Sequence, residues 1–203
     1  MRLYLDGSLD DSITHSRLIG TIDNTPALPI YIGGWQTLGS WFLDGRIDEV
    51  RISRIERYSG PSYVIPSSEF TTDSDTVALW HFDESMGNTI HDSSGNGHHG
   101  TRFGASWAGP TWTDGEFGKA LSFDGVDDYV VVPHSSSLDL SITDRGTIEA
   151  WIKLDSLPTT GNWYNILEKG AGTSGQYSFA IYGESGGHEH LEFWIKVSGG
   201  PWK

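Results

Sequence analysis

The sequence LDGRIDEVRIS, residues 43–53, sets the expectation for the fold. Its Asp44-Gly45 pair is a strong signal for a tight turn, and residues 47–52 then have the composition of a strand. Successive side chains of a strand point to opposite faces. The expected buried face carries Asp48, Val50 and Ile52, and the expected solvent face carries Glu49 and Arg51.

Further short runs of strand-forming residues occur along the chain, and Asp-rich and Gly-rich turns separate them. They are residues 2–5, 29–32, 77–82, 120–123, 129–132, 147–154, 177–182 and 191–197. No segment keeps a period of 3.6 over three turns, so little helix is expected. Residues 58–75 contain two prolines and seven Ser or Thr, which is typical of a connector lying over the surface. The pattern predicts an all-β protein, an antiparallel β-sandwich.

Several longer phrases occur together in this chain. They are ALWHFDE at 78–84 followed by DSSGNGHHGT at 92–101, GKALSFDGVDDYV at 118–130, TIEAWIK at 147–153, and LDGRIDEVRIS at 43–53. In combination they resemble the strands of a laminin-G-like domain, and the last one resembles its closing strand. The resemblance implies a concanavalin-A-like jelly roll.

The order of these phrases is unusual, because the closing strand precedes the opening strand. Residues 1–57 resemble the last third of such a domain, and residues 76–203 resemble the first two thirds, with residues 58–75 between them. Two origins are compatible with this order. The chain is either a window on a tandem array or a permuted domain whose two pieces complete one sandwich, within one chain or between neighbouring copies.

The energetics of strand edges give a specific prediction for this arrangement. Residues 1–57 form too few strands to cover a core, and residues 76–203 without the closing strand would leave an apolar edge exposed. We therefore expect residues 47–52 to pair antiparallel with residues 78–82, which would bury several large side chains at about 1.5–3 kcal/mol each.

Composition excludes several classes of partner. Acidic residues outnumber basic ones 27 to 13, and the net charge of −14 argues against nucleic acid and against an anionic membrane surface. No apolar run approaches the ~18 residues of a membrane span. There is no Cys, so disulfides, zinc thiolate sites and thiol nucleophiles are excluded.

Calcium is the expected cofactor. Residues 92–97 (DSSGNG) place short oxygen-bearing side chains around two glycines, which suits either a hard cation or a loop that hydrogen-bonds to itself. The resemblance implies a structural Ca²⁺ where the opening strand, the loop after it and an Asp of the closing strand meet. The ligands it implies are Asp48, Asp83, Asp92, Gly95 and Asn96.

The nine Trp residues suggest a second kind of site. Sugar rings stack on exposed aromatic faces, and Trp35 and Trp163 stand in turn-like settings where such faces occur. These two are the candidate ligand-binding residues, with packing beneath a loop as the alternative. Tryptophans within strands, such as Trp80 and Trp194, are expected in the core.

Nothing in the sequence indicates catalysis. The E-x-D-x-x-E phrase of laminarinase-type glucanases, which share this sandwich, is absent. Glu189 and Glu192 are three residues apart, so a regular strand would turn them to opposite faces. Glu149 is the only acid in its strand, and there is no G-x-S-x-G nucleophile elbow.

The expected protein is therefore a noncatalytic, extracellular or cell-surface module for adhesion or carbohydrate binding, with structural calcium. Its expected partners are a glycan or cell-surface protein and neighbouring copies of the domain. A structural repeat of a surface layer, fibre or sheath is one alternative. An accessory domain of a glycoside hydrolase is another.

Overall fold

The computed structural model describes residues 2–12, 27–35, 41–104, 110–139, 145–170, 176–186 and 189–195. These residues form fourteen strands and one short 3₁₀ turn, Ser136–Leu138. The strands are β1 (Arg2–Leu5), β2 (Ser8–Ser12), β3 (Ile30–Ile32), β4 (Asp44–Ser53), β5 (Thr76–Trp80), β6 (Thr89–Ile90), β7 (Gly100–Phe103), β8 (Thr111–Asp114), β9 (Lys119–Asp124), β10 (Tyr129–Val132), β11 (Thr147–Leu154), β12 (Trp163–Lys169), β13 (Tyr177–Gly183) and β14 (Glu189–Ile195).

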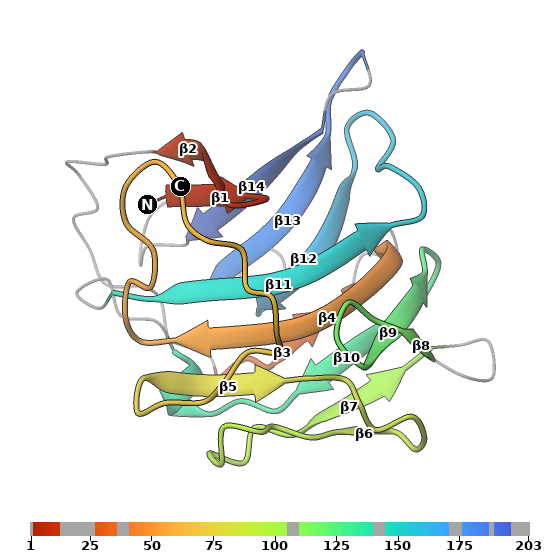
Figure 1. Cartoon of the computed structure of the whole chain (residues 1–203). Coiled ribbons are helices and arrows are strands. Elements are labelled where there is room, and N and C mark those ends of the chain that lie inside the picture. Colours follow the sequence, from red (N-terminus) through yellow and green to blue (C-terminus); the bar gives the residue numbers. More distant parts are fainter. Residues whose placement is uncertain are drawn as a thin grey trace.

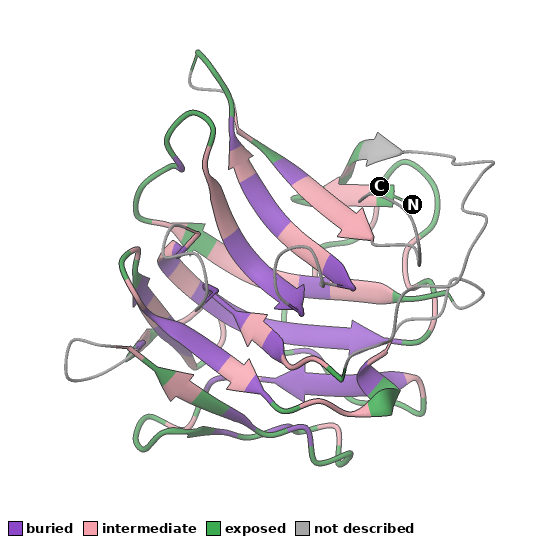
Figure 2. Cartoon of the chain, turned by 180° about the vertical axis from the view of Figure 1, so that it is seen from behind, coloured by how far each residue is buried: buried purple, intermediate pink, exposed green. Residues whose placement is uncertain are grey.

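The strands form two antiparallel sheets packed face to face, with the β1–β2 hairpin beside them (Figure 1). One sheet has the order β14-β13-β12-β3-β10-β7-β6, and the other has the order β11-β4-β9-β8 with β5 also paired to β4. The expected all-β antiparallel sandwich is confirmed. Seen from behind, buried and less buried residues alternate along several of the strands, as expected where one face of a sheet covers a core (Figure 2).

Each sheet has a strand from the first 57 residues at its centre. β3 lies between β12 and β10, and β4 lies between β11 on one edge and both β9 and β5 on the other. Within β4–β5, Val50 is opposite Trp80 and Ile52 is opposite Ala78. The expected antiparallel pairing of these two strands is confirmed within one chain, over Val50–Ser53 and Thr76–Trp80, whereas Ile47 pairs with Leu121 of β9.

The alternation expected along β4 is interrupted at Glu49. Glu49 has a φ of 52°, and the β4–β11 register shifts here, so that β4 contains one residue more than its partner. Ile47, Val50 and Ile52 all belong to the buried hydrophobic cluster. The expectation that Asp48 shares a face with Val50 and Ile52 is therefore wrong, because the bulge lets Ile47 and Val50 both face the core.

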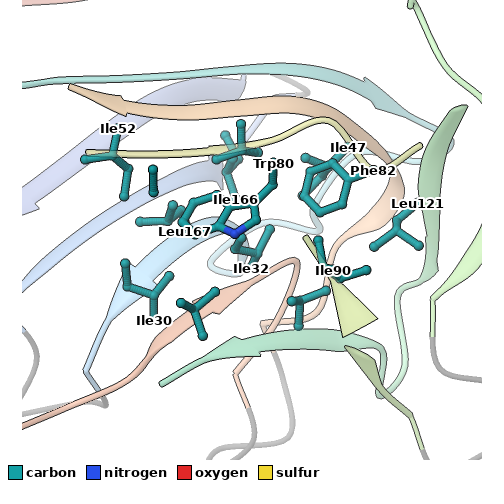
Figure 3. Close-up of a cluster of buried hydrophobic side chains, with 14 of the residues drawn as sticks. Ile30, Ile32, Ile47, Ile52, Trp80, Phe82, Ile90, Leu121, Ile166 and Leu167 are labelled. Atoms are coloured by element: carbon teal, nitrogen blue, oxygen red, sulfur yellow. The ribbon is translucent and has the colours of Figure 1, made fainter. Parts of the chain in front are cut away.

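The core lies between the two sheets and receives side chains from both (Figure 3). Trp80 and Phe82 are fully buried at its centre, and Trp80 Nε1 donates a hydrogen bond to the His98 carbonyl. Phe82 has a φ of 59°, which ends β5 at Trp80, two residues earlier than the sequence predicts. Burial of Trp80, expected from its position in a strand, is confirmed.

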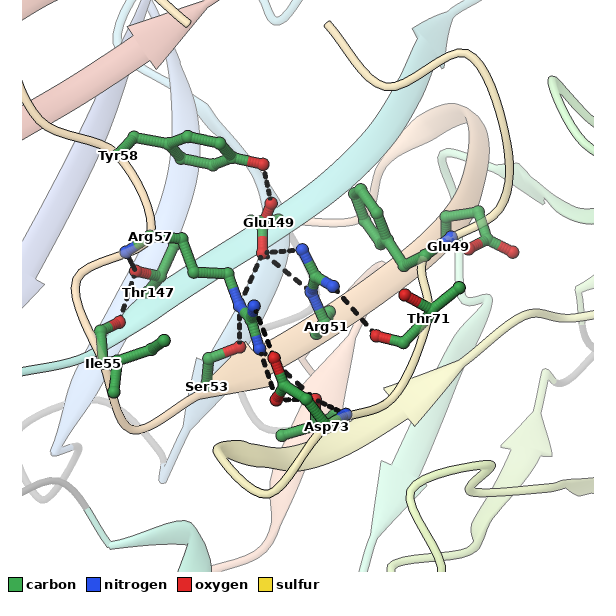
Figure 4. A network of polar contacts seen from close by, with 12 residues as sticks. Glu49, Arg51, Ser53, Ile55, Arg57, Tyr58, Thr71, Asp73, Thr147 and Glu149 are labelled. Atoms are coloured by element: carbon green, nitrogen blue, oxygen red, sulfur yellow. Dashed lines mark hydrogen bonds and ion pairs between the residues drawn. The ribbon is translucent and has the colours of Figure 1, made fainter. Parts of the chain in front are cut away.

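Residues 58–75 cross the sheet that contains β4, on the side that points away from the core, and they cover charged side chains there (Figure 4). Arg51 and Glu149 form an ion pair at 2.8 Å with side chains only 9 % and 8 % exposed. The Arg51 guanidinium also donates to the Thr71 carbonyl and lies 4.4 Å from the Phe70 ring centroid. Tyr58 donates to the same Glu149 carboxylate. The segment is thus held by polar contacts to β4 and β11.

No helix in the described part of the chain has the length and apolar character needed to cross a membrane.

Removal of Glu149 should show how much this buried ion pair contributes to the stability of the fold. Glu149→Ala leaves Arg51 buried without its carboxylate and should lower the free energy of unfolding by about 3–5 kcal/mol. The double variant Arg51→Leu/Glu149→Leu should cost less, because no unpaired charge then remains. Urea denaturation of the three proteins measures the difference. A cost below about 1 kcal/mol for Glu149→Ala, the size of a surface pair, would contradict this role.

Candidate functional site

The face of the seven-stranded sheet that points away from the core carries a group of aromatic side chains. Ile181 on β13 and Leu191 on β14 belong to the buried hydrophobic cluster. Their sequence neighbours Tyr182 and His190 therefore point to the other face, which we call the outer face. Trp163 on β12 is directly opposite Tyr182, and Tyr182 is directly opposite His190. The three side chains form one row across three strands.

The rings in this row contact one another. The Trp163 and Tyr182 centroids are 4.8 Å apart, and the Tyr182 and His190 centroids are 5.4 Å apart. On the other side of Trp163 lies Trp41, with a centroid distance of 5.0 Å. Trp41 reaches this position because its backbone carbonyl accepts a hydrogen bond from Asn165 N of β12. The result is a continuous run of four rings on the outer face.

Glu192 holds the run of rings in place. Its Oε2 atom accepts hydrogen bonds from Trp163 Nε1 and from Trp194 Nε1, both at 2.8 Å. Its Oε1 atom lies 3.1 Å from His190 Nε2. One carboxylate therefore orients two indoles and one imidazole, and its side chain remains 19 % exposed. We call Trp41, Trp163, Tyr182, His190, Glu192 and Trp194 the aromatic site.

The two sequence candidates for ligand stacking differ in the structure. Trp163 lies in the aromatic site and is only partly buried. Trp35 packs against Trp41 and is 3 % exposed, so its ring has no open face on which a ligand could stack. The structure thus shows Trp35 as a buried packing residue, in line with the packing alternative.

Sequence reasoning did not find the remaining members of the aromatic site. Trp194 was expected in the core, but it lies on the outer face. The pairings show this, because Trp194 is opposite Ser178 and Ser178 is opposite Glu168. Glu168 in turn is opposite Tyr31, which lies on the outer face of β3. β12 itself was not predicted, because a register shift between Asn165 and Leu167 interrupts its alternation. The signal that could have been used is the two-residue spacing of His190, Glu192 and Trp194, which places them on one face of a strand.

The structure brings two of the expected metal ligands, Asp48 and Asp83, to one turn between β8 and β9. Asp48 Oδ2 accepts a hydrogen bond from Phe117 N at 3.0 Å, and Asp83 Oδ1 accepts one from Lys119 N at 2.6 Å. A Cβ atom on Gly115 would collide with the Asp48 carboxylate, and one on Gly118 would collide with the Asp83 carboxylate. Both carboxylates therefore lie directly against this glycine-containing turn.

Asp48 is electrostatically unusual. It is 3 % exposed, and its Oδ1 atom is buried with no hydrogen-bond partner among the residues that the structure describes. Burial raises the pKa of Asp48 to about 6, and the nearby Glu49 charge acts in the same direction, although the Phe117 amide opposes both. A buried carboxylate oxygen without a donor is costly. A bound cation would satisfy it, so the residues at this turn fit a hard metal ion.

The other three expected metal ligands hold a loop against β5. Asp92 accepts four hydrogen bonds, which come from Leu79 N, Ser94 N, Ser94 Oγ and His98 N. Burial alone would raise the pKa of Asp92, but these hydrogen bonds outweigh it and lower that pKa. Asn96 donates to two backbone carbonyls of β5, and Gly95 supplies a left-handed φ of 84°. The self-bonded loop, the alternative to a cation site, accounts for these contacts.

Among the described residues, one group of acidic side chains brings three potential metal-ligating atoms within 4.8 Å of one another, at Asp124, Asp127 and Asp128. Asp48, Asp83 and Asp92 do not form such a group. Asp124 Oδ1 accepts from the Val126 and Asp127 amides, and Asp128 Oδ2 accepts from the Asp124 amide. These are local hydrogen bonds from side-chain carboxylates to backbone amides within one turn. Burial, followed by the Asp124 charge, raises the pKa of Asp128 to about 6.

Comparison with protein-family models, with curated proteins and with solved structures gives no match in any of the three. The chemistry of this chain therefore has to be inferred from the arrangement of its own residues.

The raised pKa of Asp128 gives a pH-dependent stability. Its pKa is near 3.8 in the unfolded chain and about 6 in the folded one, so the unfolded state loses its proton first as pH rises. The free energy of unfolding should therefore fall between about pH 4 and pH 6, by about 3 kcal/mol from this group. Asp128→Asn, which keeps an acceptor for the Asp124 amide, should remove that part of the fall.

Urea denaturation at several pH values in the presence of a chelator makes the comparison, and the difference between variant and wild type isolates Asp128 from other acids. Parallel stability curves for the two proteins from pH 4 to pH 7 would show that Asp128 ionises normally.

Proposed function

We propose that this chain is a noncatalytic, extracellular carbohydrate-binding or adhesion module of the laminin-G-like type, with its ligand on the aromatic site. The observation that carries the proposal is the run of partly buried rings held by Glu192 on the outer face. Pyranose rings have apolar C–H faces that stack on aromatic rings, and their hydroxyls donate to carboxylates. Rings fixed before binding lose little conformational entropy when a ligand arrives.

The engagement of the glutamates supports a binding role over hydrolysis. Hydrolysis of a glycosidic bond requires two carboxyl groups that flank the bond, one to donate a proton and one to act as base or nucleophile. Glu192 is engaged by two indoles. Glu149 is bound by Arg51 beneath the connector. The glycoside hydrolase alternative therefore assigns catalysis to a different domain.

A structural Ca²⁺ between Asp48, Asp83 and the turn at 115–119 is the second part of the proposal. The unpartnered Oδ1 atom of Asp48 supports it, because Ca²⁺ is bound by carboxylate and backbone carbonyl oxygens. The ion would neutralise two carboxylates and fasten the β8–β9 turn to β4. Its contribution would be to stability.

Calcium should raise the thermal stability of the protein. An ion that binds only the folded state stabilises it by about 2.7 kcal/mol at a hundred times its Kd. Asp48→Asn should abolish most of this gain, whereas Asp10→Asn, an exposed acid of the β1–β2 hairpin, should retain it. Differential scanning calorimetry with added calcium and with chelator gives the comparison. A melting temperature indifferent to both would eliminate the calcium site.

Glycan binding should depend on Trp163. We expect a glycan array to show weak, saturable binding, and Trp163→Ala to weaken it by about tenfold or more, because a stacking ring is lost. Trp112→Ala, on β8 of the other sheet, is the matched control and should bind as the wild type does. A blank array together with self-association of the protein would support the structural-repeat alternative instead.

A further inference from the structure

The aromatic site has an excess of negative charge. Glu192 lies on the outer face, and the described residues of β13 and β14 include neither Lys nor Arg. The Glu184 carboxylate lies 3.9 Å from His190, at the end of the same row of rings. The whole chain carries a net charge of −14. Such a surface repels uronic acids and sulfated sugars and attracts cations.

Glu192 retains capacity for a ligand. An ionised carboxylate has about four acceptor positions on its two oxygens. The two indole donors both go to Oε2, and within the described part of the chain the polar contact of Oε1 is with His190 alone. The side chain is 19 % exposed, so a donor from solution can approach it. A protonated amine makes a stronger hydrogen bond to a carboxylate than a hydroxyl does.

We propose that the ligand of the aromatic site is an amine-bearing sugar, whose ammonium group binds Glu192 while its ring stacks on Trp163 or Trp194. This inference rests on the proposed function and specifies its substrate class. Three features of one site favour it: a carboxylate in the centre, two indoles that donate to that carboxylate, and a second carboxylate, Glu184, at the end of the same row of rings. Aromatic rings also attract cations. A neutral sugar would use the rings and a hydroxyl hydrogen bond to the carboxylate, and it would gain little from the negative charge.

Matched trisaccharides test the inference. Isothermal titration calorimetry at mildly acidic pH would compare a trisaccharide of glucosamine with the trisaccharide of N-acetylglucosamine that has the same linkage. We expect the amine form to bind about tenfold more tightly, with an advantage that shrinks as salt is added. Short oligosaccharides are required because a long cationic polymer would bind any acidic protein.

Two variants assign the effect to one carboxylate. Glu192→Gln should remove the advantage of the amine form, so that the two trisaccharides bind this variant with the same affinity. Glu69→Gln, an exposed glutamate on the connector over the other sheet, changes the net charge equally and should have no effect. Near-ultraviolet circular dichroism of Glu192→Gln checks that the indoles keep their positions.

The outcomes separate this inference from the proposed function. Equal affinity for both trisaccharides, lost in Trp163→Ala, would overturn the amine preference and leave a glycan-binding site. An amine advantage that persists in Glu192→Gln would overturn the role of Glu192. Equally tight binding of a simple amine such as ethanolamine would overturn the inference that the ligand is a sugar. No binding of either trisaccharide, with a blank glycan array, would overturn the proposed function itself.

Discussion

The hydrogen bonding of β4 along both of its edges is the constraint on which most of the structure depends. β11 occupies one edge, and β9 and β5 share the other, so β4 cannot shift without breaking three pairings. Its apolar side chains are fixed over the core, and its polar ones must lie on the opposite face. There Arg51 would be costly to bury alone. Glu149 from β11 and the segment 58–75 supply its partners, which explains why a connector without regular strands is nevertheless held in place.

The bulge at Glu49 connects this strand to the proposed metal site. The extra residue places Ile47 and Val50 on the core side and directs Asp48 to the turn between β8 and β9. Glu49 itself is fully buried and accepts a hydrogen bond from Phe70 N of the connector, with His81 Nδ1 2.6 Å from its other oxygen. Core packing, attachment of the connector and the proposed cation site therefore all depend on one local change of register in β4.

The fold was largely predictable from sequence, because strand edges and turn residues are local signals. The β4–β5 pairing followed from the cost of leaving an apolar edge open. The bulge in β4 and the register shift in β12 were not predictable, and each of the two caused an error. The bulge in β4 misplaced Asp48, and the register shift in β12 concealed that strand. The aromatic site depends on pairing across three strands, and Trp163 and Glu192 are 29 residues apart, so no local pattern could join them.

On the outer face of the seven-stranded sheet, aromatic rings are held in fixed positions and are still open to a ligand from solution. Its strands are anchored by the core beneath them, so the rings of Trp163 and Trp194 are held by both backbone and Glu192. A titration followed by the NMR signals of the indole N–H groups tests directly whether this surface binds glycans. We predict that the Trp163 and Trp194 signals shift with saturating glycan while the signal of the core residue Trp80 stays in place. Binding that leaves the Trp163 and Trp194 signals unchanged would contradict it.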